Sequence, residues 1–120
     1  MSKTLQPTTL STRYLESSGW LVGCVERVIP RTNIKQDLFG FADLVACKPG
    51  VQPTLVQVTS NDHVADRRKK ILASHKAMVA LMSGFRIVVH GWEKPTKTLP
   101  TPRLRSIEVT MADFDEAPPP

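Results

Sequence analysis

Polar side chains interrupt two apolar segments of this sequence that have the composition of strands. Asp43 lies in the run FADLVAC, and Gln57 and Thr59 lie in the run TLVQVTS. Side chains alternate across a strand, so pairing of the two segments as a hairpin places all three residues on one face if the register allows it. Buried polar groups need partners or a ligand. Asp43, Gln57 and Thr59 are therefore candidate catalytic residues.

Two further carboxylates precede this hairpin. Glu26 interrupts an apolar segment, and Asp37 comes shortly before Gly40. Carboxylate and amide oxygens are the ligands that Mg²⁺ and Mn²⁺ prefer, and such an ion can polarise a phosphodiester and activate water. The sequence therefore predicts a site for Mg²⁺ or Mn²⁺ that serves phosphodiester hydrolysis, with the ligands Glu26, Asp37, Asp43 and Gln57.

The charge balance favours a polyanionic partner. The chain has 16 Lys and Arg residues against 11 Asp and Glu residues, a formal net charge of +5 and a pI near 9.6. A basic field raises the local concentration of nucleic acid without selecting a sequence. The run Arg67-Arg68-Lys69-Lys70 adds to it, although such a run is more often a solvated helix face than a nucleic-acid contact.

Periodicity and turn residues predict a mixed α/β architecture (an α+β mixed sheet). The first helix is expected to be capped by Thr8 or Thr9 and to stop at Gly19, and the turn at residues 48–50 should close a hairpin. We expect helices over 10–18 and about 61–83, strands over 20–29, 41–47, 54–60 and 85–92, and a weaker edge strand over 105–111.

On the long helix the apolar residues recur at steps of three and four, which predicts one core-facing stripe that also contains His75. Its members are Val64, Ile71, Leu72, Met78, Val79 and Met82. Cys24 and Cys47 lie in apolar runs without metal-ligand spacing, so we expect buried, reduced thiols.

The domain boundaries follow from composition. We expect disorder over residues 1–7, a single domain over 8–110 and a disordered acidic and Pro-rich tail over 111–120. No segment has the apolar length of a signal peptide or a membrane span, so we expect no membrane partner and a cytoplasmic location.

The stretch from Asp37 to Ser60, with Glu26 before it and the basic segment HVADRRKKI after it, resembles the core of the PD-(D/E)xK nuclease superfamily, in particular its small resolvase-like and phage-encoded members. The resemblance covers roughly residues 8–92. It implies a restriction-endonuclease-like core in the order helix, three strands, helix, strand, with an optional further strand. It also implies Mg²⁺-dependent cleavage of DNA and allows a homodimer, because nucleases of this size commonly cut two strands as dimers.

Residue by residue, Asp43 matches the metal-binding Asp of the second strand and Glu26 matches the early acid. Gln57 stands where the family has an acid on the third strand, and Thr59 stands where it has a lysine. Gln57 can ligate an ion but adds no charge, and Thr59 cannot replace an ammonium group. Another cation must then serve the site, and the candidates are Arg67, Lys70 and Lys94. The candidate nucleic-acid contacts are Arg67, Arg68, Lys70 and Lys94, and Lys70 is also a candidate catalytic residue.

Two other interpretations stay open. The chain could keep the nuclease scaffold as a catalytically inactive DNA-binding or interaction module, in which Gln57 and Thr59 mark a dead site. It could also be a structural accessory protein whose basic face only keeps it in solution. The first alternative predicts salt-sensitive DNA binding that does not depend on Mg²⁺, and the second predicts no DNA binding at physiological salt.

Overall fold

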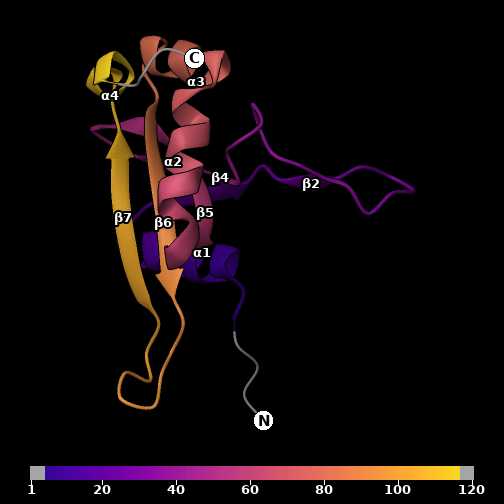
Figure 1. Ribbon diagram of the computed structural model, residues 1–120, viewed down its shortest axis with the longest axis vertical. Coiled ribbons are helices and arrows are strands. Elements are labelled where there is room, and N and C mark those ends of the chain that lie inside the picture. The colour runs from indigo at the N-terminus through magenta and orange to yellow at the C-terminus, as the bar shows by residue number, and fades with distance from the viewer. Residues whose placement is uncertain (1–4, 117–120) are drawn as a thin grey trace.

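A five-stranded mixed sheet organises the chain, with helices on both of its faces (Figure 1). The computed structural model describes residues 5–116. The sheet has the strand order β1-β4-β5-β6-β7, and a second, two-stranded sheet pairs β2 with β3. The fold is therefore a mixed α+β fold. In chain order, the elements are α1 (Pro7–Ser17), β1 (Leu21–Cys24), β2 (Arg27–Val28), β3 (Lys35–Gln36), β4 (Leu44–Lys48), β5 (Val51–Ser60), the 3₁₀ turn η1 (Asn61–His63), α2 (Val64–Leu72), α3 (His75–Met82), β6 (Arg86–Glu93), β7 (Arg103–Val109) and α4 (Met111–Glu116).

The strand directions combine two hairpins and one crossover. β1 and β5 both pair antiparallel with β4. The β4–β5 pairing is the hairpin that the turn at residues 48–50 predicts, and Gly50 has the positive φ of 82° that favours glycine. β5 then pairs parallel with β6 through the helical crossover of α2 and α3, and β7 adds antiparallel to β6 at the edge. The centre of the sheet is thus β5, which has β4 and β6 as neighbours.

The two faces of the sheet carry separate cores. α1 covers one face, where Leu15 packs with Leu44, Ala46 and Val56. The crossover helices and α4 cover the other face, where the buried residues include Phe41, Leu55, Val64, Ile71, Ala77, Ile87 and Val89. Figure 1 shows α2 in front of β5 and β6, and α1 behind them. Leu55, Gln57 and Thr59 alternate with Val56 along β5, so these three residues face α2.

The first helix begins earlier than the sequence predicts and ends where it predicts. It starts at Pro7, a residue favoured in the first turn because the N–H that it lacks has no helical partner there. Gly19 has a φ of 91°, and the N–H groups of Gly19 and Trp20 bond to the carbonyls of Glu16 and Leu15. This is a Schellman motif, in which glycine stops the helix.

The prediction of one helix over 61–83 is wrong. The chain breaks at Ala73 and Ser74, and the Ser74 side chain accepts the N–H of Ala77 at 3.3 Å as an N-cap. The break resets the helical phase, so the predicted stripe does not hold along its length. Val64 and Ile71 are buried, but Val79 and Met82 are 45% and 72% exposed, and Ala77 and Ala80 take the core positions of α3.

The predicted strand over 20–29 is also divided. Residues 21–24 join the main sheet, whereas the chain leaves that sheet after Val25 and pairs residues 27–28 with residues 35–36. The predicted polar turn over 31–36 is therefore the tip and second strand of a hairpin. Val28 is 56% exposed, whereas Val22 and Val25 pack against the two cores, so only the first part of this apolar segment serves the main sheet.

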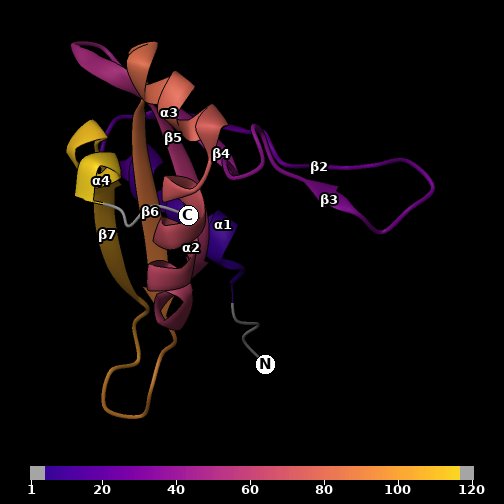
Figure 2. The ribbon, with the colours of Figure 1, turned by 45° about the horizontal axis from the view of Figure 1, so that its top comes forward.

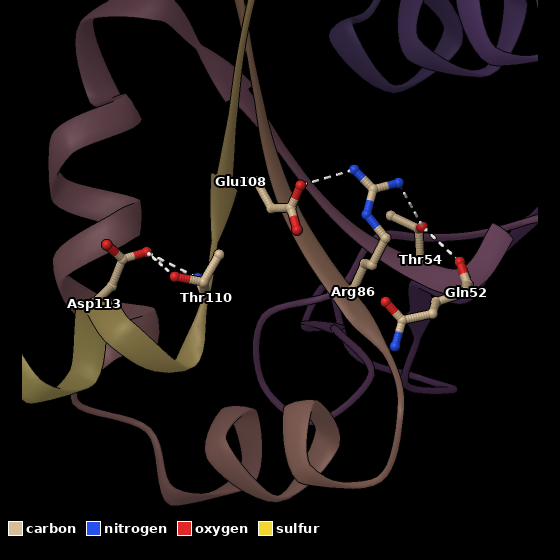
Figure 3. A network of polar contacts seen from close by, with 6 residues as sticks. All are labelled: Gln52, Thr54, Arg86, Glu108, Thr110 and Asp113. Atoms are coloured by element: carbon tan, nitrogen blue, oxygen red, sulfur yellow. Dashed lines mark hydrogen bonds and ion pairs between the residues drawn. The ribbon is translucent and has the colours of Figure 1, made fainter.

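The C-terminal segment contains a helix where the sequence predicts a disordered tail from residue 111. α4 begins after Thr110, whose N–H is accepted by the Asp113 carboxylate at 2.8 Å, which is one half of a capping box (Figure 3). Asp113 also pairs with Arg68 of α2 at 3.1 Å. These contacts hold α4 against the body of the protein. The disorder predicted for residues 1–4 and 117–120 lies outside the described residues.

Figure 3 also shows how Arg86 joins three strands of the sheet. Its guanidinium donates to Glu108 on β7 at 2.9 Å and lies 3.5 Å from the Thr54 hydroxyl on β5. Thr54 in turn donates to the carbonyl of Gln52 at 3.1 Å. The contacts therefore link the end of β7 to the start of β5 across β6.

Three predictions about single residues are wrong. Cys24 and Cys47 are free thiols, as expected, but both are exposed rather than buried. His75 is exposed because it is the first residue of α3 rather than a member of a continuous stripe. Within residues 5–116, no helix combines the length and apolar character that crossing a membrane requires.

Candidate functional site

Asp43 lies at the junction of three strands, immediately before β4. Its N–H donates to the carbonyl of Val56 on β5 at 2.9 Å, and its carbonyl accepts the N–H of Val25, which follows β1, at 3.0 Å. Phe41, Ala42 and Leu44 around it are all buried, and Asp43 itself is 4% exposed. The backbone therefore holds this carboxyl group in the interior, near the end of the sheet where β1 stops.

The Asp43 side chain is bound to β5 by two hydrogen bonds. Its Oδ2 atom accepts the backbone N–H of Val58 at 2.8 Å and the side-chain Nε2 of Gln57 at 3.1 Å. The predicted hairpin register thus brings Asp43 and Gln57 into contact. Nε2 donates to Asp43, and the amide oxygen of Gln57 can act as an acceptor for another group.

Glu26 and Asp37 converge on Asp43 from outside the sheet. One carboxylate oxygen from each of the three residues lies within 4.8 Å of the others. Glu26 directly precedes β2 and Asp37 directly follows β3, so closure of the β2–β3 hairpin brings the two carboxylates together. The residues predicted as metal ligands therefore gather at one place, although they come from separate segments of the chain.

The environment of Asp43 disfavours its charged form. The pKa of Asp43 is raised from 3.8 to about 8. Burial is the main cause, the neighbouring Glu26 and Asp37 carboxyl groups act in the same direction, and the hydrogen bond from Val58 acts in the opposite direction. In the absence of a cation, the site therefore holds a proton on Asp43 at neutral pH. A divalent cation would relieve the same crowding of acidic groups.

The donor set fits a hard divalent cation. Oxygens on opposite sides of an octahedral Mg²⁺ are about 4 Å apart, and those of Ca²⁺ or a longer-bonded ion are up to about 5 Å apart. One oxygen of each of the three carboxylates lies within 4.8 Å of the others, which is close to these values. Gln57 presents its Nε2 atom to Asp43, so its amide would have to turn over to supply a fourth oxygen.

The remaining candidate residues occupy different positions. Thr59 is buried on the α2-facing side of β5, two residues beyond Gln57. On α2, Lys70 is exposed and Arg68 pairs with Asp113. Arg67 is half-buried, and its buried Nε atom has no hydrogen-bond partner among residues 5–116. Lys94 is exposed after β6. The structure gives none of these cations a direct contact with the acidic cluster.

The cation that does contact the cluster was missed by sequence reasoning. Lys35 Nζ lies 3.5 Å from Glu26 Oε1, and the Lys35 side chain is 68% exposed. The two residues are cross-strand neighbours only because β2 pairs with β3 in the register Val28↔Lys35. The sequence could have revealed this pair only through recognition of the hairpin, whose turn residues Pro30 and Asn33 were visible.

Two cavities lie away from this cluster. One, of about 280 Å³, is lined by residues of the N-terminal segment and of the β6–β7 connection, among them Leu10, Trp92 and Pro102. The other, of about 210 Å³, lies on the α1-facing side of the sheet beside Tyr14, Arg86 and His90. Neither is lined by Glu26, Asp37 or Asp43.

The comparisons with known proteins give no relative: no family model, curated protein or solved structure matches this chain. The resemblance to PD-(D/E)xK nucleases therefore stays a prediction, and the function must be argued from the geometry of the cluster.

Proposed function

We propose that this protein is a Mg²⁺-dependent nuclease with a restriction-endonuclease-like core, which hydrolyses phosphodiester bonds of DNA. The observation that carries the proposal is the convergence of Glu26, Asp37 and Asp43 to within 4.8 Å of one another, with the Gln57 amide bound to Asp43. Burying a polar or charged group costs free energy unless it has a hydrogen-bond or charge partner. Three acidic groups around one point favour a cation as that partner.

The order of the elements supports the proposal. α1, β1, β4, β5, the α2–α3 crossover and β6 follow one another as helix, three strands, helix and strand, with β2 and β3 inserted after the first strand. Asp43 directly precedes the second of these strands and Gln57 lies on the third, which are the strands that the resemblance associates with metal ligands. The support is an analogy of arrangement, so the chemistry must be argued from the site.

The roles of the residues follow from their positions. Mg²⁺, or Mn²⁺, would be held by Asp43, Glu26, Asp37 and the Gln57 amide oxygen, and it would supply charge stabilisation for the phosphodiester and activation of water. Arg67 and Lys70 of α2 would steady the phosphate. Thr59 offers a hydroxyl on the same face of β5, where it can hydrogen-bond to water or to a ligand but cannot provide charge.

A plasmid-nicking assay in Mg²⁺, Mn²⁺ and EDTA tests the proposal, with a four-way-branched DNA as a second substrate. We expect cleavage by the natural sequence in either metal, none in EDTA and none by Asp43→Asn. Asp115→Asn is the matched control, because it removes an exposed carboxylate of α4 and should cleave normally. Metal-dependent cleavage that persists in Asp43→Asn would exclude this site as its source.

One observation favours a second function, in which the scaffold binds DNA without cutting it. The third strand carries Gln57 and Thr59 in place of an acid and a lysine, and the raised pKa of Asp43 weakens the competition of a metal ion with a proton. A binding module retains DNA in EDTA with undiminished affinity and cleaves no substrate in either metal. The same assay, run beside a binding measurement, separates the two functions.

A further inference from the structure

Residues 27–36 form an arm that projects from the body of the protein. Figures 1 and 2 show β2, β3 and the turn between them extending sideways, away from the main sheet and its helices. β2 and β3 pair antiparallel, with Arg27 opposite Gln36 and Val28 opposite Lys35. Each side of the arm contains five residues, which corresponds to a reach of roughly 17 Å.

Hydrogen bonds define the tip of the arm as a turn. The Ile29 N–H donates to the Ile34 carbonyl at 2.9 Å, and the Thr32 N–H donates to the Ile29 carbonyl at 3.2 Å. The Thr32 hydroxyl also donates to Ile29 and accepts the N–H of Ile34. Arg31 takes the left-handed φ of 66° that glycine or asparagine usually occupies, at a cost of about 1 kcal/mol. A cation therefore stands at the tip despite its backbone strain.

The charge of the arm has one sign. Arg27, Arg31 and Lys35 are exposed, and residues 27–36 contain no acidic residue. Val28 and Ile34 add apolar surface, since they are 56% and 59% exposed. The arm thus combines a cationic ribbon with two apolar side chains, a combination suited to a polyanion that also presents apolar edges.

The arm is rooted in the acidic cluster. Glu26 precedes its first residue and Asp37 follows its last, and the oxygens of these carboxylates lie within 4.8 Å of each other and of Asp43. Lys35 bridges the two regions through its contact with Glu26. A nucleic acid held by the arm is consequently held beside the three carboxylates.

We propose that the arm is a β-ribbon that enters the major groove of duplex DNA and presents the adjoining phosphodiester to the acidic cluster. The major groove of B-form DNA is about 12 Å wide and admits a two-stranded ribbon. Arg27 and Arg31 contact phosphates or guanine edges, and Val28 and Ile34 meet apolar groups such as thymine methyls. Duplex DNA as the substrate that is cleaved rests on the proposed nuclease function, whereas the binding of duplex DNA by the arm does not.

Duplex DNA fits the arm better than two other partners do. The major groove of an RNA duplex is too deep and narrow for side chains to read, which disfavours duplex RNA. A second copy of this chain, paired arm to arm by twofold symmetry, would bring Arg27, Arg31 and Lys35 close to the same three residues of the other copy. Like charges repel, so the composition of the arm opposes such a dimer.

Fluorescence anisotropy of a labelled duplex in EDTA tests the arm without any need for cleavage. Arg27→Gln with Arg31→Gln should weaken binding roughly tenfold to thirtyfold at physiological salt and reduce the slope of log K against log salt by about two. Lys76→Gln with Arg105→Gln is the control, because both residues are exposed, lie off the arm and remove the same charge. The control should change affinity less than about twofold.

Three results would overturn the proposal. The first is an equal loss of affinity in the control, which would indicate that the positive charge of the whole protein, and not the arm, binds the DNA. The second is an equal arm dependence for duplex RNA or single-stranded DNA, which would exclude the groove. The third is a change of self-association in light scattering with unchanged DNA affinity, which would assign the arm to a second copy. If only the arm variant loses affinity and the natural sequence cleaves nothing, binding of duplex DNA by the arm stands, whereas the nuclease proposal and the presentation of a phosphodiester to the acidic cluster fail.

Discussion

Gln57 donates a hydrogen bond to Asp43 across the β4–β5 hairpin, with Nε2 and Oδ2 3.1 Å apart. A carboxylate at residue 57 would add a fourth acidic group to the buried cluster of Glu26, Asp37 and Asp43, whereas the amide adds no charge. The amide therefore stabilises the metal-free site, in which burial already disfavours charge on Asp43. It also lowers the negative charge that the site offers to a cation. Gln57 thus makes the metal-free protein more stable and lowers the affinity of the site for a cation.

This role of the amide predicts opposite effects of Gln57→Glu with and without Mg²⁺. In EDTA, the added carboxylate should lower the free energy of unfolding, because it places a further acidic group in a buried site that already disfavours charge. In Mg²⁺, the added charge should strengthen ion binding about tenfold and restore the stability. Thermal unfolding across a Mg²⁺ titration measures both effects.

Gln52→Glu is the matched control for that experiment, because Gln52 is an exposed glutamine of the same strand and its amide contacts only the Gly84 carbonyl among the described residues. It should leave Mg²⁺ affinity unchanged. If Gln57→Glu destabilises the protein equally with and without Mg²⁺, the amide serves the fold and not an ion.

Asp43→Asn should stabilise the metal-free protein at alkaline pH. The pKa of Asp43 is about 8 in the folded state and 3.8 as its ordinary value, so the native fold binds more protons than the unfolded chain between these values. The stability that Asp43 contributes is therefore lost as the pH rises from about 4 to about 8. Asparagine keeps an acceptor for Val58 and does not titrate.

Urea unfolding in EDTA at pH 6 and pH 8 measures this difference. We expect the free energy of unfolding of Asp43→Asn to exceed that of the natural sequence by at least about 1 kcal/mol at pH 8 and by less at pH 6. Added Mg²⁺ should raise the stability of the natural sequence but not that of Asp43→Asn. A variant that is less stable than the natural sequence at pH 8 would show that the ionised carboxylate is not disfavoured.

Local signals in the sequence predicted the hairpin that carries the site. Asp43 and Gln57 could be placed on one face because the turn at residues 48–50 fixes the pairing of two short apolar segments, and their contact follows from alternation along each strand. Gly19 ended α1 for an equally local reason, the positive φ of the residue after the helix. Each of these predictions needed only residues that are close in the sequence.

The other features depend on contacts that composition does not encode. The apolar residues of segment 20–29 suit a buried strand, but the chain leaves the sheet at Glu26 so that this carboxylate meets Asp37 and Asp43. The break at Ser74 and the cap at Thr110 did have local signals, since both are hydroxyl residues with a partner three residues later. The continuous pattern of apolar residues outweighed the first of these signals, and the acidic composition outweighed the second.

A buried chain of polar groups joins α1 to β6 on the opposite face of the sheet. Ser11 Oγ lies 2.9 Å from His90 Nδ1 and accepts the indole N–H of Trp92 at 2.8 Å. Burial lowers the pKa of His90 from 6.5 to about 4, and His90 is 3% exposed. Nδ1 of the neutral imidazole can accept a hydrogen bond from the Ser11 hydroxyl, whereas Nδ1 of the protonated ring cannot.

Acidification should therefore destabilise the fold through His90. Its folded-state pKa lies below the unfolded value, so the unfolded chain binds more protons between pH 6.5 and pH 4, and stability falls as the pH falls through this window. The contribution amounts to about 3 kcal/mol at pH 4. His90→Asn keeps an acceptor near Nδ1 and does not titrate, so its stability should fall less steeply in urea unfolding at pH 7, 5.5 and 4. Identical pH dependence in the two proteins would remove His90 as the cause.

Gly91 is the position where β6 meets the start of α2 most closely. A Cβ atom added there would lie 2.1 Å from Val64 Cγ2 and 3.2 Å from Asn61 Cα, and Val64 is fully buried. Gly91→Ala should therefore push α2 from the sheet and cost about 1 to 3 kcal/mol in urea unfolding. Val64→Ala removes the atom that clashes, and alone it should also destabilise the protein by leaving a cavity. In the double variant the added methyl fills the space of the lost one. The destabilisation of the double variant should therefore be smaller than the sum of the two single-variant destabilisations by at least about 0.5 kcal/mol. Additive costs would indicate that the backbone at Asn61, and not the Val64 side chain, requires glycine at this position.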